Sequence, residues 1–201
     1  VYDLQNSSRS RFYKKILHPK SSFEIWSSSV TTLPVDKTKE EFDQEPVLQR
    51  FKYQLSKSGL VTKNVLKPNF EWSCEDISNI KSFYKLENYI ILFPFSSAHL
   101  TIKRWPFYNE LIAKINEKFK DNYQVIIAPG PNEIKIANEI DAKTILHNEK
   151  ALNISQLSTL IKDSSFVIAN DTGPAHMAAH LNTKGLVLFG SHTTAKKVSI
   201  E

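Results

Sequence analysis

Runs of strand-forming residues alternate with helical patterns through the second half of the sequence, and this alternation restricts the fold more than any other feature. From residue 89 onward, apolar runs such as "YIILFPF", "YQVIIA" and "SFVIA" are each followed by a segment of helical period. Such alternation indicates βαβ units, which place parallel strands in one sheet and helices on its faces. The sequence therefore predicts a doubly wound α/β domain whose ligands bind at the carboxyl ends of the strands.

The segment "PFYNELIAKINEKFK" predicts an amphipathic helix. Phe107, Leu111, Ile115 and Phe119 recur every four residues behind Pro106, which suits the first turn of a helix. Residues four apart share one face, so we expect these four side chains to form the packed stripe. Further helices and strands of the same series are expected at "EIKIANEI", "TIL", "ISQLSTLIKD", "SFVIA", "AHMAAHL" and "LVLF".

The first part of the chain has another pattern. "VYDLQ" and "SFEIW" favour short strands, "SSRSRFYKKIL" favours a helix, and "TTLPVDKTKEEFDQ" is polar and predicted to be irregular. "PVLQRFKYQLSKSG" predicts a helix that ends at Gly59. The mixed segment "LKPNFEWSCEDISNIKSFYKLEN" is typical of a domain boundary, so we expect residues 1–80 to form part of one domain with its linker. Residues 81–201 would form the ligand-binding domain.

Both ends of the chain predict an incomplete protein. Val1 already lies in a strand-like run, and the sequence stops at "AKKVSIE" just after a strand. Two strands alone make a marginal domain, so the front segment is expected to belong to a larger sheet.

Composition bounds the function without deciding it. With 41% hydrophobic residues in 201, the chain can bury a core, and its single cysteine, Cys74, cannot form an internal disulfide. It has no secretory signal and no run long enough to span a membrane, which predicts a cytoplasmic protein. The net charge of +5 comes from scattered lysines, which favours a solvated surface over nucleic-acid binding. Attraction to anionic lipid or to a phosphorylated substrate stays open as an alternative. The histidines show no metal-ligand spacing, so no zinc site is expected.

The turn "NDTGPAH", residues 170–176, carries the strongest chemical signal. An acid or hydroxyl that caps the helix and Pro174 in its first turn are ordinary helix-start residues, but Gly173 and His176 are not explained in this way. Glycine lets a ligand approach the backbone, and a helix start offers free amides to an anion such as phosphate. Because Asp171 would repel a phosphate, we expect it to face sugar hydroxyls.

Two other turns at strand ends carry candidate ligands. Lys103, Ser96 and Ser97 supply a cation and two hydroxyls, which could hold a pyrophosphate; the alternative is a surface loop with Trp105 packed on the next helix. Glu133 follows "APGPN" and could accept hydrogen bonds from ribose hydroxyls, although an acid at a helix start is also favoured by the helix dipole.

Several ordered motifs resemble one family. "VYDLQNSSRS", "YIILFPFSS", "KRWP", "VIIAPGPNE", "NDTGPAH" and "GLVLFGS" occur in the same order as in the ADP-heptose:lipopolysaccharide heptosyltransferases, the family-nine glycosyltransferases. The resemblance covers nearly the whole chain and is most specific at "KRWP" and "NDTGPAH". It implies the GT-B architecture, with two Rossmann-like domains that face each other across a cleft. The C-terminal domain would bind the nucleotide sugar and the N-terminal domain the acceptor.

The resemblance also implies roles for single residues. Lys103 and Asp171 would be catalytic, Lys103 on the pyrophosphate and Asp171 on the heptose hydroxyls. Glu133 would hold the ribose, and Leu152 would line the adenine pocket. The implied donor-binding set is Ser96, Ser97, Lys103, Glu133, Leu152, Asp171, Thr172, Gly173 and His176. No metal or other cofactor is implied, because a lysine and helix amides can stabilise the leaving diphosphate.

The implied activity is the inverting transfer of heptose from ADP-heptose to a lipopolysaccharide inner-core sugar, with contact at the inner face of the cytoplasmic membrane as an open possibility. A GT-B enzyme with another nucleotide sugar or acceptor and an inactive nucleotide-binding remnant are the alternatives. The chain departs from the family at two places. The segment that carries the family's general base is absent, and Asp3 belongs to a later motif; we therefore expect the donor site without that base. "SHTT" follows Gly190 where the family usually has Pro-Thr.

Overall fold

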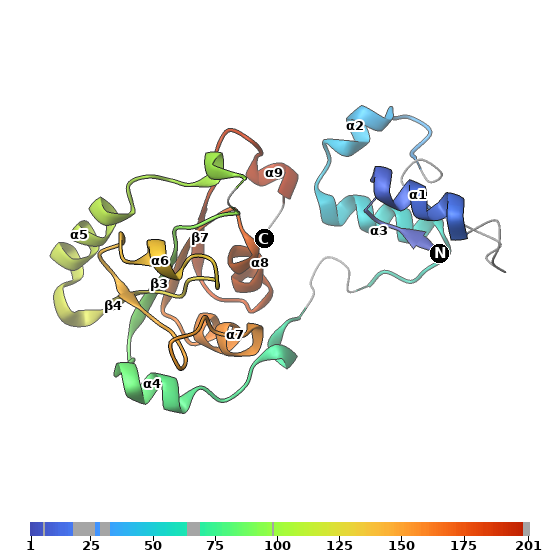
Figure 1. Ribbon diagram of the computed structural model, residues 1–201. Helices are drawn as coiled ribbons and strands as arrows, with labels where there is room; N and C mark the ends of the chain where they lie inside the picture. The colour runs from blue at the N-terminus through green and yellow to red at the C-terminus, as the bar shows by residue number, and fades with distance from the viewer. Residues whose placement is uncertain (6, 18–26, 29–32, 64–68, 98, 199–201) are drawn as a thin grey trace. The chain divides into compact units, whose positions relative to one another are not determined.

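A computed structural model describes residues 1–5, 7–17, 27–28, 33–63, 69–97 and 99–198. The chain divides into two compact units (Figure 1). The first unit comprises Val1–Pro68 and Ala195–Ser199, and the second comprises Asn69–Thr194 with Ile200–Glu201. The division falls inside the segment where the sequence predicted a boundary, but it lies before residue 80, because helix α4 (Ser78–Tyr84) packs with the second unit.

The second unit is built on a five-stranded parallel sheet of order β5-β4-β3-β6-β7. The strands are β3 (Tyr89–Phe93), β4 (Gln124–Ile127), β5 (Lys143–Thr144), β6 (Phe166–Asn170) and β7 (Gly185–Leu188). From the central strand β3, the next two strands in sequence, β4 and β5, are added on one side. The last two, β6 and β7, are added on the other side of β3. The predicted α/β fold with a doubly wound parallel sheet is confirmed, and its switch point lies between β3 and β6.

Helices cover both faces of this sheet, which explains why its central strands are apolar throughout. Successive residues of β3 alternate between two cores, with Ile91 in one and Ile90 in the other. The first core contains residues of α4, α7 (Ile154–Lys162) and α8 (Gly173–His180). The second contains residues of α5 (Tyr108–Phe119) and α6 (Ile134–Ala137). Short 3₁₀ turns lie at η2 (Glu71–Ser73), η3 (Thr101–Lys103) and η4 (Lys120–Asn122).

The packed face of α5 agrees with the predicted stripe at Leu111 and Ile115 and differs from it at Phe107 and Phe119. Its buried residues are Tyr108, Ile112 and Ile115, whereas Phe107 and Phe119 are 52% and 37% exposed. Tyr108 carries a polar hydroxyl, yet its ring packs in the second core and its hydroxyl donates to the buried Asn170 side chain. The packed face therefore extends to Tyr108 and Ile112, because the core accepts an aromatic residue whose polar tip is hydrogen-bonded.

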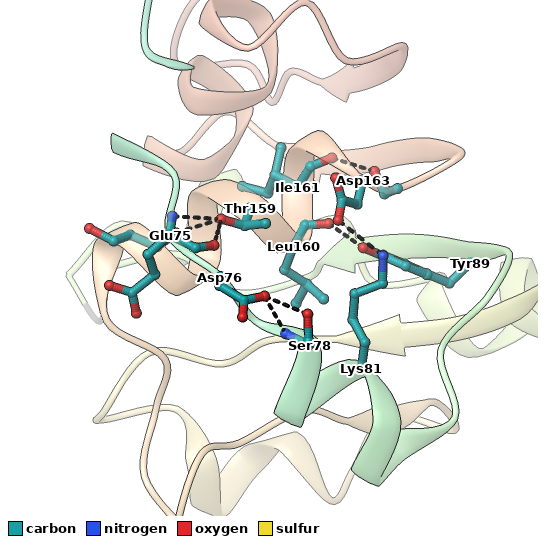
Figure 2. Close-up of polar contacts among 11 residues, drawn as sticks. Glu75, Asp76, Ser78, Lys81, Tyr89, Thr159, Leu160, Ile161 and Asp163 are labelled. Carbon is teal, nitrogen blue, oxygen red and sulfur yellow. Dashed lines mark hydrogen bonds and ion pairs between the residues drawn. The ribbon is translucent and has the colours of Figure 1, made fainter. Parts of the chain in front are cut away.

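Helix α4 is joined to α7 by polar contacts (Figure 2). Lys81 and Asp163 form an ion pair with a 3.0 Å separation of Nζ and Oδ2. The Thr159 hydroxyl accepts from the Glu75 amide at 3.0 Å and donates to the Glu75 carbonyl at 2.6 Å. These contacts, together with the burial of Ile80 on α4, place this segment with the sheet.

The first unit contains a parallel pair of short strands, β1 (Tyr2–Asp3) and β2 (Ser27–Ser28). Its helices are α1 (Ser8–Leu17), α2 (Lys39–Asp43), α3 (Val47–Lys57) and α9 (Ala195–Val198). The Gln54 amide of α3 donates to the Asp3 carbonyl at 2.9 Å, which fastens α3 to β1. The predicted strand at "SFEIW" lies outside the described residues.

The segment predicted to be irregular, residues 31–44, contains α2, so that prediction was wrong in part. The signal was present, since Thr38 and Glu41 form a capping box in which each side chain bonds the backbone of the other. By contrast, the predicted stop at Gly59 is confirmed: α3 ends at Lys57, and Gly59 adopts φ +80°, a conformation that glycine tolerates. None of the helices among the described residues is long and apolar enough to cross a bilayer.

Candidate functional site

A pocket of about 310 Å³ opens at the switch point of the second unit's sheet. Its walls come from the segments that follow β3, β4 and β6 and from the start of α7. Every residue of the predicted donor-binding set except His176 lines it: Ser96, Ser97, Lys103, Glu133, Leu152, Asp171, Thr172 and Gly173. The fold thus brings together residues that are up to 77 positions apart, because the carboxyl ends of parallel strands meet at one edge.

Asp171 and Lys103 form the polar centre of this pocket. Asp171 follows the last residue of β6, and only 5% of its side chain is exposed. Lys103, at the end of η3, donates from Nζ to Asp171 Oδ2 at 2.8 Å and to the Asp171 carbonyl at 3.0 Å. The pair joins the loops on the two sides of the switch point, so both groups have fixed positions before any ligand binds.

Two histidines complete the surroundings of this carboxylate. His192 Nε2 lies 2.9 Å from Asp171 Oδ2, and His176 Nε2 lies 3.9 Å from Oδ1. Burial by itself would raise the pKa of Asp171, but the hydrogen bonds from Lys103 and His192 outweigh it and hold that pKa below the usual range. Burial lowers the pKa of His176 although Asp171 opposes this, which favours the neutral imidazole at pH 7.

The lowered pKa of Asp171 predicts a loss of stability in acid. The folded-state pKa lies below the unfolded value of about 3.9, so the carboxylate's contribution is complete above that pH and is lost as the pH falls through the folded pKa. We expect the difference in unfolding free energy between the wild type and Asp171→Asn to change as the pH falls below about 4. Urea unfolding of both proteins from pH 7 to pH 2 measures it, and a difference independent of pH would refute the assignment.

The start of α8 presents free backbone donors to the pocket. Thr172 is the residue before the helix and has extended backbone, but its hydroxyl donates back to the Asn170 carbonyl at 3.2 Å instead of capping the helix. Among the described residues, the Thr172 and Gly173 amides have no acceptor. The first amides of a helix also lie at the positive end of its dipole, so this point suits an anion.

Glu133 is held by one oxygen. Its Oε2 accepts from the Gly130 amide at 2.8 Å, which folds the side chain back over the turn that follows β4. The other oxygen, Oε1, has no hydrogen-bond partner among the described residues. A carboxylate fixed in this way can accept from a hydroxyl-bearing ligand without first being ordered.

The Ser96 hydroxyl already has partners within the protein. It donates to the Leu100 carbonyl at 2.9 Å and accepts from Arg104 Nε at 3.2 Å, and the residue is 4% exposed. The hydroxyl hydrogen is therefore already used, and Ser96 braces the loop that carries Lys103. Ser97, which is exposed at the pocket wall, is the serine with access to a ligand.

The pocket also has an apolar part. Leu152 and Leu157 line it and pack against the core beneath. Trp105, for which the sequence favoured packing, lies against the second core with its ring 5.4 Å from that of Tyr108. The pocket therefore combines an apolar wall with a cation, an anion and free amides.

Sequence reasoning missed Asn170 and His192. Asn170 is fully buried; its amide donates to the Pro94 carbonyl at 2.8 Å, and its Oδ1 accepts from the Trp105 amide and the Tyr108 hydroxyl, each at 3.2 Å. It thereby ties the end of β3 to the start of α5. Its place as the last residue of β6, next to the predicted ligands, was the available signal. His192 lacked one, because its partner is 21 residues away.

Comparisons with known proteins identify the family and the fold. The family model described as glycosyltransferase family 9 (heptosyltransferase) matches residues 1–198. The chain is similar to a structure of the Escherichia coli ADP-heptose LPS heptosyltransferase II at 20% identity and a TM-score of 0.56, with 80% of this chain and 52% of that chain covered. It is also similar to a glycosyltransferase of family 9 from Veillonella parvula at 20% identity and a TM-score of 0.60, with 84% and 51% covered.

A third solved structure, E. coli heptosyltransferase WaaC with ADP, matches at 18% identity and a TM-score of 0.52, with 77% of this chain and 47% of that chain covered. The chain thus spans about half the length of the structures it matches. At these identities the likeness concerns the fold. No curated protein sequence matches the chain.

Proposed function

The chain belongs to glycosyltransferase family 9, the heptosyltransferase family, and from this premise we propose that its second unit binds the nucleotide-sugar donor of an inverting heptosyltransferase. The proposed reaction moves a heptose from ADP-heptose to an inner-core sugar of lipopolysaccharide. The observation that carries the proposal is the convergence of Lys103, Asp171 and the free amides of α8 in one pocket at the sheet's switch point.

The charges of the pocket support a diphosphate leaving group. When the anomeric C–O bond breaks, the electron pair stays on the diphosphate, whose negative charge increases. Lys103 and the amides of Thr172 and Gly173 are placed to stabilise that charge, and they stabilise the transition state more than the ground state. The acceptor oxygen forms the new bond on the opposite face of the sugar, and its proton passes to a general base that we do not assign to any residue of this chain.

The chemistry of Asp171 supports the proposal that the sugar of the donor binds next to this carboxylate. A buried carboxylate with a lowered pKa is an acceptor, and Oδ1 has no partner within hydrogen-bond distance among the described residues. Sugar hydroxyls are donors that fit this oxygen. The same ion pair reduces the repulsion between the Asp171 carboxylate and the phosphates, because the Lys103 ammonium donates to Asp171 Oδ2.

Glu133 and the apolar wall support a nucleoside. Oε1 of Glu133 is available to ribose hydroxyls, and Leu152 lies in the apolar part that would receive a base. We further propose that the first unit, Val1–Pro68, is part of the acceptor-side domain. In this assignment the donor site belongs wholly to the second unit.

The natural full-length enzyme tests this function. ADP release should be followed with ADP-heptose and a lipopolysaccharide acceptor that lacks the heptose, and the product should be identified by its mass. Turnover that needs both substrates supports the proposal. Turnover with a UDP- or GDP-sugar instead would favour the alternative, a GT-B enzyme with another donor. Binding of ADP without any transfer would indicate an inactive remnant.

Gly173 offers a sharp test of the phosphate site. Its φ is not positive and an added Cβ would meet no atom within 4 Å, so neither backbone nor packing requires glycine there. We expect Gly173→Ala to change the unfolding free energy by less than about 0.5 kcal/mol, as a surface substitution does. It should weaken ADP binding by roughly tenfold or more, because a methyl group would occupy the space through which a phosphate meets the amides.

Gly190→Ala is the matched control for stability, since we expect this substitution to destabilise the protein. An added Cβ at Gly190 would lie 2.5 Å from the Ile102 carbonyl, so the protein must shift. We expect a clear loss of stability there. Chemical unfolding and ADP titration of both variants separate the cases; an equal loss of stability in both would remove the argument for Gly173.

A further inference from the structure

We propose that His192 is a positioning residue of the donor site: it holds Asp171 by Oδ2, so that Oδ1 keeps a fixed direction toward the donor. The inference rests on the proposed function for its catalytic consequence, whereas the contact itself can be tested without any substrate. His192 lies in the loop after β7, where the chain departs from the family pattern, and no role was expected for it from its sequence.

The geometry places two donors on one carboxylate oxygen. His192 Nε2 is 2.9 Å from Asp171 Oδ2, and Lys103 Nζ is 2.8 Å from the same atom. The two side chains are 17% and 20% exposed, so water competes little for either contact. Oδ1 accepts no hydrogen bond from any of the described residues, and His176 Nε2 lies 3.9 Å from it, beyond hydrogen-bond distance. The carboxylate is therefore held from one side and open on the other.

The contact fixes the tautomer of His192. The hydrogen bonds that hold the pKa of Asp171 low keep its carboxylate ionised, and an ionised carboxylate only accepts. The hydrogen must then lie on His192 Nε2. His192 Nδ1 is buried and has no hydrogen-bond partner among the described residues, so a second N–H at that atom would be buried without an acceptor. The imidazole thus acts as a one-sided donor.

The backbone around His192 is also held in place. Gly190, two residues earlier, lies so close to η3 that an added Cβ would be 2.5 Å from the Ile102 carbonyl and 3.2 Å from His192 Nδ1. Ile102 directly precedes Lys103. The loop that carries His192 and the turn that carries Lys103 are therefore packed against each other, which sets the spacing of the two donors that meet at Asp171.

This arrangement predicts an effect on turnover more than on nucleotide affinity. Removal of His192 leaves the Lys103 contact but lets the Asp171 carboxylate rotate, and contacts to ADP itself do not pass through Oδ1. We expect His192→Leu to lower kcat by roughly tenfold while the Kd for ADP changes less than twofold. His192→Gln can place an amide N–H near Nε2 and should recover most of the lost kcat.

The experiment has two arms. In the first, imidazole ¹⁵N–¹H spectra of the ligand-free chain report the tautomer, with the His192 signal assigned by its loss in His192→Gln. The expected result is hydrogen on Nε2, and a shift of that signal in Asp171→Asn. Hydrogen on Nδ1, or a signal insensitive to Asp171→Asn, would overturn the proposal.

The second arm measures kcat and KM of the full-length enzyme and its His192 variants with ADP-heptose. His147→Leu is the control, because His147 is also half-buried and hydrogen-bonded, to Gln156 at 2.9 Å, but lies outside the pocket. A wild-type kcat in His192→Leu would overturn the positioning role. If the wild-type enzyme itself does not turn over ADP-heptose, the proposed function fails. The imidazole spectra then still test the contact between His192 and Asp171.

Discussion

Replacing Lys103 by alanine should weaken ADP binding by roughly 10- to 150-fold, since a hydrogen bond to a charged group contributes about 1.5–3 kcal/mol. Two effects act together. The diphosphate loses an ammonium that is already in place, and Asp171 keeps a buried negative charge that Lys103 no longer covers. Transfer by the full-length enzyme should fall further, because the lost charge stabilises the leaving diphosphate most in the transition state.

Calorimetric titration with ADP measures the first effect. Lys81→Ala is the matched control: Lys81 also pairs with an aspartate, at 3.0 Å, but it joins α4 to α7 outside the pocket (Figure 2). We expect Lys81→Ala to bind ADP as the wild type does. Equal affinities in Lys103→Ala and Lys81→Ala would remove Lys103 from the site.

A double variant separates the two effects of Lys103→Ala. If the uncovered carboxylate repels the diphosphate, adding Asp171→Asn should restore part of the affinity for ADP. The coupling energy from this cycle measures the interaction of the two side chains, since they are in contact. Strictly additive losses would mean that the effect of Asp171 on ADP binding does not depend on Lys103.

The second large effect concerns stability. Asn170→Leu should lower the free energy of unfolding by about 3 kcal/mol or more, because unpaired buried polar groups cost about 1–3 kcal/mol each. The substitution leaves the Pro94 carbonyl and the Trp105 amide without their Asn170 partner, while the Tyr108 hydroxyl retains the Phe93 carbonyl at 3.3 Å.

Urea unfolding measures this loss, with Asn109→Leu as the control. Asn109 also forms two hydrogen bonds to backbone, to the Glu139 carbonyl at 2.9 Å and from the Asp141 amide at 3.0 Å, but in an exposed position. Water can replace those bonds, so we expect a loss under about 1 kcal/mol. A similar loss in both variants would mean that burial of Asn170 does not decide its contribution.

These residues show what the sequence could and could not reveal. The strand and helix series was predictable because periodicity is a local property. The meeting of Lys103, Glu133 and Asp171 in one pocket was predictable because parallel strands bring their carboxyl ends together. The burial of Tyr108 on α5 was not, because the partners of its hydroxyl are the Phe93 carbonyl and Asn170, which lies 62 residues away.

Side-chain roles within the pocket depended on contacts that no pattern records. Ser96 and Ser97 are equivalent in sequence, yet Arg104 and the Leu100 carbonyl occupy the hydroxyl of Ser96 and leave Ser97 exposed. His192 joins Asp171 through the fold alone. The short helix α2 is the opposite case, since the Thr38 and Glu41 of its capping box are visible in the sequence.

The most direct test of the central claim, a diphosphate site at the start of α8, is a titration of the ¹⁵N-labelled chain with ADP followed by backbone amide spectra. We expect saturable shifts of the Thr172 and Gly173 amides and of the Gly130 amide, which donates to Glu133. UDP and GDP should shift the same α8 amides more weakly. A folded chain whose α8 amides do not respond to ADP, or whose shifts cluster instead at the groove formed by Ile80, Phe83 and Tyr84, would contradict it.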